Sequence, residues 1–161
     1  MAGSAPFILG EYRRTLDERY RLTIPSPWSE WLAGESADCF LAKERRGCLS
    51  LWSGAGWRSR LDEGVALIEQ KMRAGRLDGR IAEVQRLGRL LSTRHAPVQL
   101  AGRSRLLIPE GFREFLGVEP GGEVMLVGAA VCVEIWRPDV WLIYLEKRMP
   151  SFRRLFEDLA G

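Results

Sequence analysis

The chain repeats itself at an offset of 84 residues, and this repeat restricts its possible folds more than any other feature of the sequence. The segment Arg21–Pro25 (RLTIP) falls on Arg105–Pro109 (RLLIP) at this offset. The same register, without a gap, matches Cys48 with Cys132, Trp52 with Trp136, and Trp57 with Trp141. Because rare residue types seldom fall in register by chance, the sequence predicts an internal duplication.

The sequence of each copy predicts the same order of short strands and helices. A strand leads into an arginine-bearing turn, a second strand ends at Ile-Pro, and a short helix follows. These helices are expected over Pro27–Leu32 and Gly111–Leu116. Two strands then form a hairpin, over Asp38–Lys43 with Gly47–Trp52 and over Glu123–Val127 with Val131–Trp136. A helix that begins near Trp57, or after Pro138-Asp139, closes each copy.

Further helices are predicted between the copies and after the second one. Leu61, Val65, Ile68 and Met72 form one apolar stripe, which continues after Gly75 as far as Leu91. This segment is either a helical hairpin or one long kinked helix. A tail helix, capped by Ser151, carries the apolar residues Phe152, Leu155, Phe156 and Leu159 on one face. That face needs a partner, either the chain's own core or a neighbouring subunit.

A single copy of roughly 50 residues is small for an independent core, because a short chain buries too little of its surface. Two copies that pair pseudo-symmetrically overcome this limit. We therefore divide the chain into a first repeat (7–58), a helical linker (59–92), a second repeat (93–149) and a C-terminal helix (150–161).

Composition argues against an enzyme, a metalloprotein and a membrane protein. His95, beside Pro97, is the only histidine and is interpreted as a linker residue; the three cysteines form no metal-binding pair, and we expect Cys48 and Cys132 to be small core residues. We expect no cofactor and no small-molecule ligand.

Apolar runs are too short to cross a bilayer, and Met1–Pro6 lacks the features of a secretory signal, so a cytoplasmic protein is expected. The net charge of +3 permits nucleic-acid binding without requiring it.

Several segments resemble the MraZ family in the same order along the chain. Gly10-Glu11-Tyr12, followed by Thr15-Leu16-Asp17 and by Arg21-Leu22-Thr23-Ile24-Pro25, is similar to the family's opening signature, G-E-Y and then T-L-D-x-K-G-R-L-x-I-P. Later family-like segments are Gly47–Trp52, Leu126-Val127-Gly128 and Glu134-Ile135-Trp136, so the resemblance covers roughly residues 7–149.

This resemblance implies a fold, an assembly and a function. The implied fold is α+β and β-rich, a duplicated SpoVT/AbrB-like swapped-hairpin barrel with pseudo-two-fold symmetry and peripheral amphipathic helices. The implied assembly is a ring-shaped homo-oligomer. The implied function is that of a nucleoid-associated transcriptional regulator, which binds short direct repeats in double-stranded DNA upstream of division and cell-wall genes.

The candidate DNA-binding residues come from the resemblance and from the clustering of arginine. The family's D-x-x-x-R motif corresponds to Asp17 and Arg21, and in the second copy to Arg105, with Ala101 at the acidic position. Guanidinium groups suit phosphate and guanine contacts. The full candidate set is Arg13, Arg14, Asp17, Arg19, Arg21, Arg103 and Arg105. Alternatively, Arg21 and Arg105 pair internally with Glu30 and Glu114.

Two departures from the family pattern leave a second function open. Tyr20 and Ser104 stand where the family has glycine, a residue that would permit a positive φ at low cost. Either the turn is reshaped, or Tyr20 has a new role such as stacking or a hydrogen bond to phosphate. The alternative function is an oligomeric protein-interaction module, antitoxin-like or scaffolding, that kept the fold and lost specific DNA binding.

Overall fold

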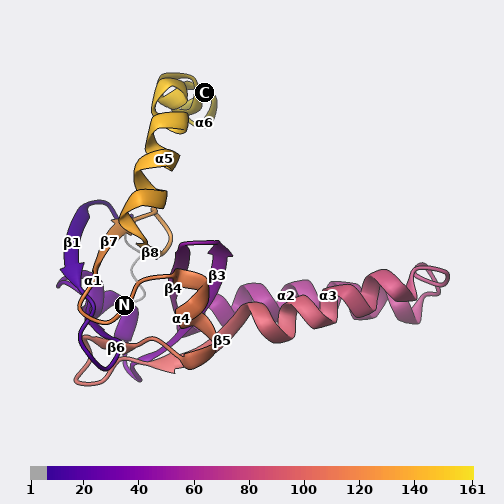
Figure 1. The fold of residues 1–161 in the computed structure, drawn as a ribbon. Helices are drawn as coiled ribbons and strands as arrows, with labels where there is room; N and C mark the ends of the chain where they lie inside the picture. The colour runs from indigo at the N-terminus through magenta and orange to yellow at the C-terminus, as the bar shows by residue number, and fades with distance from the viewer. Residues whose placement is uncertain (1–6) are drawn as a thin grey trace.

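The structure is a computed structural model that describes residues 7–161, so Met1–Pro6 lies outside the described residues. Its centre is a six-stranded antiparallel sheet in the order β1-β7-β8-β4-β3-β5 (Figure 1). The strands are β1 (Glu11–Thr15), β3 (Asp38–Arg45), β4 (Cys48–Ser53), β5 (His95–Gln99), β7 (Glu123–Gly128) and β8 (Val133–Trp136). With the helices below, the fold is α+β, as expected.

The strands of the two copies are interleaved in this sheet. β1, from the first copy, pairs with β7 of the second, whereas β5, from the second copy, pairs with β3 of the first. The two hairpins meet at the centre, where β4 pairs with β8 and Leu51 lies opposite Val133. Neither copy therefore forms a sheet of its own, and every junction between the hairpins and the first strands joins residues far apart in sequence.

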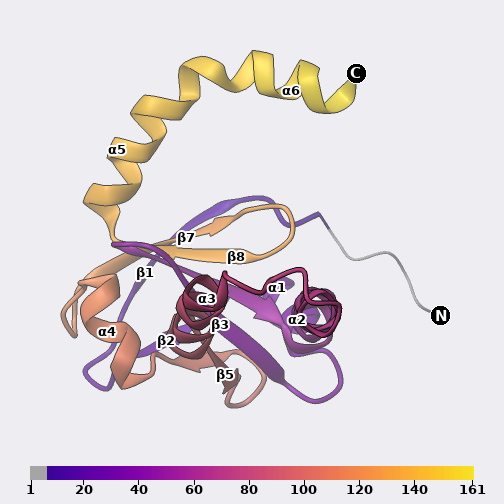
Figure 2. The ribbon, with the colours of Figure 1, turned by 90° about the vertical axis from the view of Figure 1, so that its right-hand side faces the viewer.

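A second, two-stranded sheet joins the copies directly. β2 (Arg21–Thr23) runs antiparallel to β6 (Arg105–Leu107), and Leu22 lies opposite Leu106, its equivalent in the repeat. Both leucines are buried in the main core, as are Ile24 and Ile108 just beyond the strands. We call this pair of strands the ribbon. It lies at the end of the core away from the C-terminal helices (Figures 1 and 2).

Short helices and recurring tryptophans close the core. α1 (Trp28–Ala33) and α4 (Glu110–Leu116) bury Trp28 and Leu32, and Phe112 and Leu116, respectively. The ring centres of Trp52 and Trp57 lie 5.4 Å apart, and those of Trp136 and Trp141 lie 5.1 Å apart. The tryptophans that recur in the repeat thus pack between strands and helices. Cys48 and Cys132 are buried, as expected.

The segment between the copies is a helical hairpin, which decides between the two predicted forms. α2 (Gly54–Arg73) and α3 (Ile81–Arg94) are joined by a turn over 74–80 and project from the sheet as an arm (Figure 1). We call these two helices the arm. The helix predicted to begin near Trp57 begins at Gly54 and continues without a break into the arm.

The C-terminal helices leave the core in another direction. α5 (Pro138–Arg148) rises from β8, and a 3-10 turn, η1 (Met149–Ser151), separates it from α6 (Phe152–Ala160), which bends over the core at a distance from it (Figure 2). The predicted cap is wrong in detail: Ser151 occupies the N-cap position of α6 and makes no side-chain capping bond. No helix formed by residues 7–161 combines the length and apolarity that a bilayer crossing requires.

The interpretation of His95 as a linker residue is wrong. His95 is the first residue of β5 and lies opposite Ala42 of β3. Its ring centre is 5.3 Å from that of Trp57 and 6.1 Å from that of Phe40. Residues 95–99 are extended because they add a strand to the edge of the sheet beside β3. This pairing is long-range, and the local sequence does not reveal it.

Candidate nucleic-acid interface

The turn before β2 is organised by the carboxylate of Asp17. Oδ1 accepts hydrogen bonds from the backbone N–H groups of Arg19 and Arg21, both at 2.8 Å, and Oδ2 accepts one from Arg21 Nε at 3.0 Å. The backbone N–H of Arg21, assisted by that of Arg19 and by the Arg21 side chain, lowers the pKa of Asp17 below its ordinary value. The carboxylate therefore fixes both the turn and the first part of the Arg21 side chain.

Tyr20 takes the left-handed backbone conformation that the family's glycine would favour, with φ of 59°. The turn is thus retained, and a tyrosine occupies it. The ring finds an internal partner, since Cζ of Arg113 lies 4.1 Å from the Tyr20 ring centre and Arg113 Nε donates to the carbonyl of Ile108 at 2.9 Å. This places the new role of Tyr20 in stacking, against an arginine of the second copy.

The turn before β6 is built differently, because Ala101 has no carboxylate. The backbone N–H of Arg105 donates to the carbonyl of Ala101 at 3.0 Å, and the N–H of Ala101 donates back to Arg105 at 2.8 Å. Positive φ values fall on Gly102 and Arg103, at 58° and 69°. Both left-handed residues of this turn therefore precede Ser104, the position equivalent to Tyr20.

The ribbon brings two of the predicted residues to one face. Side chains alternate across a strand, and Leu22 and Leu106 point into the core, so Arg21, Thr23, Arg105 and Leu107 share the outer face. Arg21 lies opposite Leu107, and Arg105 opposite Thr23, which puts the two arginines on a diagonal. Their offset along the strand direction is two residues, or about 7 Å.

The alternative internal ion pairs of these arginines do not form. Arg21 pairs with Asp17, and Glu30 instead accepts a hydrogen bond from Ser26 Oγ at 3.4 Å. Within residues 7–161, Arg105 forms no ion pair with Glu114 or with another carboxylate, and it is exposed. Both guanidinium groups are therefore placed where a ligand can reach them.

The remaining predicted residues do not join the ribbon face. Arg103 is exposed but donates a hydrogen bond to the carbonyl of Gly34. Arg13 and Arg14 lie on β1, where successive side chains point to opposite faces. Arg13 pairs with Glu123 at 3.4 Å, and Arg14 lies over the ring of Tyr12 at 5.2 Å. Arg19 lies in the first turn and is exposed.

Sequence reasoning missed three residues of this region. Thr23 and Leu107 share the ribbon face, and their alternation with the buried Leu22 and Leu106 is the signal that could have found them. Arg113, by contrast, has no local signal, because its contact with Tyr20 joins residues from opposite copies. Within residues 7–161, no group of His, Cys, Asp or Glu side chains is arranged to hold a metal ion.

Comparison with known proteins finds relatives that match most of the chain. The family model described as "MraZ protein, putative antitoxin-like" matches residues 96–159. The "Transcriptional regulator MraZ" of Syntrophomonas wolfei is 30% identical over 153 residues, covering 94% of this chain and 96% of the relative. The proteins of the same name in Heliobacterium modesticaldum and Thermus thermophilus are 28% and 29% identical, covering 94% and 86% of this chain and 95% and 87% of theirs.

Proposed function

The chain belongs to the MraZ family of transcriptional regulators, which are not enzymes, and we propose that it binds double-stranded DNA through the outer face of the ribbon. The observation that carries this proposal is the placement of Arg21 and Arg105 on that face, opposite the buried Leu22 and Leu106. The major groove of B-DNA admits a two-stranded β-ribbon, and arginine pairs with the O6 and N7 atoms of guanine.

The two arginines have different parts in this proposal. Asp17 holds Arg21 in one orientation, which favours a directed contact with a base edge. Arg105 has no such restraint and adapts to a base or a phosphate. Thr23 and Leu107 lie beside them and suit contact with a thymine methyl group. Arg19, in the exposed turn, suits contact with phosphate, whereas Arg13, Arg14 and Arg103 have internal partners and would contribute mainly to local charge.

The finer architecture is part of the same proposal. We treat the interleaved sheet as a swapped-hairpin barrel with pseudo-two-fold symmetry, supported by the pairing of Leu22 with Leu106 and by the exchange of β1 and β5 between the copies. The repeats are 7–58 and 93–149, with the linker at 59–92 and the tail at 150–161. The first boundary falls inside the continuous helix α2.

A ring-shaped oligomer is proposed because one ribbon offers few contacts. Two or three arginine contacts per subunit give the micromolar or weaker binding typical of non-specific contacts at physiological salt. Neighbouring subunits that meet successive major grooves, about 10 base pairs apart, make later contacts intramolecular. The target is then a set of short direct repeats upstream of division and cell-wall genes, bound in the cytoplasm at the nucleoid.

Fluorescence anisotropy across a salt series tests the proposal, with a DNA duplex taken from the region upstream of the gene that encodes this chain. We expect Arg21→Ala to weaken binding by about tenfold or more and to relax base preference. Arg19→Ala should weaken binding to all sequences and reduce the salt slope by about 1. Arg76→Ala, at the far end of the arm, is the matched control and should change neither.

The alternative is an oligomeric protein-interaction module, and the apolar α6 is the observation that favours it. Phe152, Leu155, Phe156 and Leu159 are all more than half exposed. If the oligomer binds no duplex at any salt concentration, or if Arg21→Ala and Arg105→Ala leave binding unchanged, the ribbon is not the DNA-binding surface. The interaction module would then be the better account.

A further inference from the structure

The arm carries an apolar groove between its two helices. The groove has a volume of about 540 Å3 and is lined by Val65, Ile68 and Met72 from α2 and by Val84, Leu87 and Leu91 from α3. A second hollow of about 480 Å3 shares Leu61, Leu87 and Leu91 with it and continues it to the base of the arm. We call this continuous feature the arm groove.

The same chain carries a helix with a matching surface. In α6, Phe152, Leu155, Phe156 and Leu159 lie at spacings of three, one and three residues, so they form one face. They are 61%, 57%, 63% and 79% exposed. Aromatic side chains bury roughly 150–250 Å2 each, so the two phenylalanines alone leave on the order of 200 Å2 of apolar surface uncovered. Such a face needs a cover.

We propose that α6 of one copy docks in the arm groove of a neighbouring copy. The proposal rests on the ring assembly proposed above and specifies its interface. A helix from one subunit in a groove of the next is a head-to-tail contact, and such contacts close into rings when the rotation between subunits permits. Each subunit in the ring uses its helix once and its groove once.

The arrangement of the chain favours docking between copies over docking within one. The arm and the tail leave the core in different directions, and α6 bends over the core rather than toward the arm (Figures 1 and 2). The principal contacts of α6 are with η1 alone. A second copy can bring the helix to the groove without refolding either surface.

Length and charge match in one orientation. Arg60 and Glu69, which both line the arm groove, are nine residues apart on α2, or about 13.5 Å. α6 has nine residues and the same length of about 13.5 Å. Arg153 and Arg154 lie near its start, and Glu157 and Asp158 near its end. Antiparallel to α2, α6 turns its acidic end toward Arg60 and its basic end toward Glu69, with its own opposite charges about four residues, or 6 Å, apart. Within one chain Arg153 pairs with Glu157 at 3.6 Å and Glu69 pairs with Arg73 at 3.8 Å, so docking exchanges these exposed pairs for contacts between copies.

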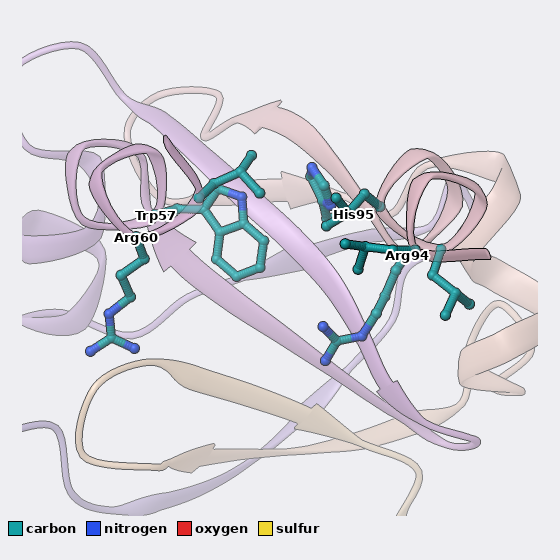
Figure 3. A pocket seen from close by; sticks show the side chains of 8 residues that line it. Trp57, Arg60, Arg94 and His95 are labelled. Atoms are coloured by element: carbon teal, nitrogen blue, oxygen red, sulfur yellow. The ribbon is translucent and has the colours of Figure 1, made fainter. Parts of the chain in front are cut away.

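The base of the groove is suited to the acidic end of the helix. Figure 3 shows Arg60 and Arg94 extending from the two sides of the arm toward the same side of the pocket, with Trp57 and His95 between the helices. Arg94 already donates to the carbonyl of Lys43 and to Glu44. Arg60 has no carboxylate partner within residues 7–161 and lies over the Trp52 ring at 5.1 Å.

Two glycines in the groove wall give the means to test the proposal. A Cβ atom at Gly64 or Gly88 would meet no heavy atom within 4 Å, and neither glycine has a positive φ. The Cβ of a larger side chain at Gly88 therefore starts in open space on the groove wall. Gly88→Trp is the groove-blocking variant, and Gly88→Ala is its matched control.

The decisive experiment mixes two complementary variants of the full chain and measures their mass by light scattering. Gly88→Trp keeps the apolar face of α6 and blocks the arm groove. Phe156→Glu keeps the arm groove open and disrupts the apolar face of α6. Alone, each should fall from the wild-type oligomer to single 18.2-kDa chains. Mixed in equal amounts, they should form a complex of two chains and no larger species, because one intact contact is available.

The controls separate this proposal from the ring itself. Gly88→Ala should keep the wild-type mass. If the wild-type chain is itself a monomer, the ring proposal fails. If the wild type is an oligomer and both Gly88→Trp and Phe156→Glu keep its mass, the ring stands and the docking of α6 is refuted.

A disulfide test checks the orientation and does not depend on the folding of the blocked variant. The three native cysteines are buried and should not compete. Under mild oxidation, Arg60→Cys with Asp158→Cys in one chain should give a ladder of linked chains on a non-reducing gel. Glu69→Cys with Asp158→Cys is the control and should give none. A ladder in the control alone would overturn the proposed orientation, and a ladder in neither would overturn the contact.

Discussion

The guanidinium carbon of Arg113 lies 4.1 Å from the centre of the Tyr20 ring, and this contact joins a turn of the first repeat to a helix of the second. It forms although Tyr20 holds a φ of 59°, a conformation that side chains with a Cβ adopt at a cost. The turn thus keeps the backbone shape typical of glycine and gains a contact that glycine cannot make.

Two substitutions at Tyr20 separate these contributions. Tyr20→Ala loses the stacking, worth about 0.5–1 kcal/mol at such a site, and keeps the strained backbone. Tyr20→Gly loses the stacking and relieves the strain. We therefore expect Tyr20→Ala to be less stable than the wild type by about 0.5–1 kcal/mol, and Tyr20→Gly to be about 1 kcal/mol more stable than Tyr20→Ala and so close to the wild type. Urea denaturation measures the difference, and equal stabilities would contradict the strain argument.

Replacing Asp17 should change DNA binding through Arg21. Asp17→Asn keeps an oxygen that can accept the backbone N–H groups and loses the charged contact with Arg21 Nε. We expect it to weaken binding about threefold to tenfold, since it frees the Arg21 rotamer. Asp17→Ala removes the turn's acceptor as well and should weaken binding further. Anisotropy titrations rank the two, and full affinity in Asp17→Asn would show that Arg21 needs no such restraint.

The same carboxylate predicts a pH effect in the acid range. Its pKa in the folded protein is lowered, chiefly by the backbone N–H of Arg21, so the unfolded chain binds a proton more readily. The stability that Asp17 contributes is therefore present above its unfolded value of 3.8 and is lost as the pH falls below it. In urea titrations the wild type should lose this increment on acidification, while Asp17→Asn should lack it at every pH.

Glu134 should have the opposite dependence. Burial raises its pKa, although the indole N–H of Trp136 donates to it at 3.0 Å. Its stabilising effect is greatest below the unfolded value of 4.5 and decreases as the pH rises through the raised folded pKa. Glu134→Gln should thus unfold at a higher urea concentration than the wild type at pH 7, and at the same urea concentration as the wild type near pH 4. The exposed Glu114→Gln serves as the control, and a constant difference between pH 4 and 7 would contradict the assignment.

The ribbon's inner face should be among the most sensitive parts of the core. Leu22 and Leu106 are 1% and 0% exposed, and they lie opposite each other. Truncation of either to alanine should cost about 2–5 kcal/mol. Because they are neighbours, the double variant should depart from additivity by roughly 0.5–3 kcal/mol. Leu107→Ala, on the outer face, should cost far less, and similar losses at Leu107 and Leu106 would contradict the assigned orientation of the ribbon.

Much of the fold could be predicted because most elements occur in both copies of the repeat, so that two segments of the sequence indicate each of them. The hairpin strands, the short helices after Ile-Pro and the arm follow from local patterns, with ends displaced by a few residues. Pairing between distant segments could not be predicted, which is why His95 was misplaced: β5 forms only because β3 offers it an edge. The family motif and the clustering of arginine led to Asp17 and Arg21 as candidates, whereas the bond from Arg103 to Gly34 depends on how the copies meet.

The two turns of the ribbon differ in build, one fixed by Asp17 and the other closed through the backbone of Ala101. Two identical chains could not be unequal in this way, but a fused pair can diverge half by half. If the subunits bind DNA as proposed above, each then has a leading and a trailing end along the duplex. In the proposed ring, subunits related by rotation all point the same way, so the sites predicted to fit them are tandem copies rather than palindromes.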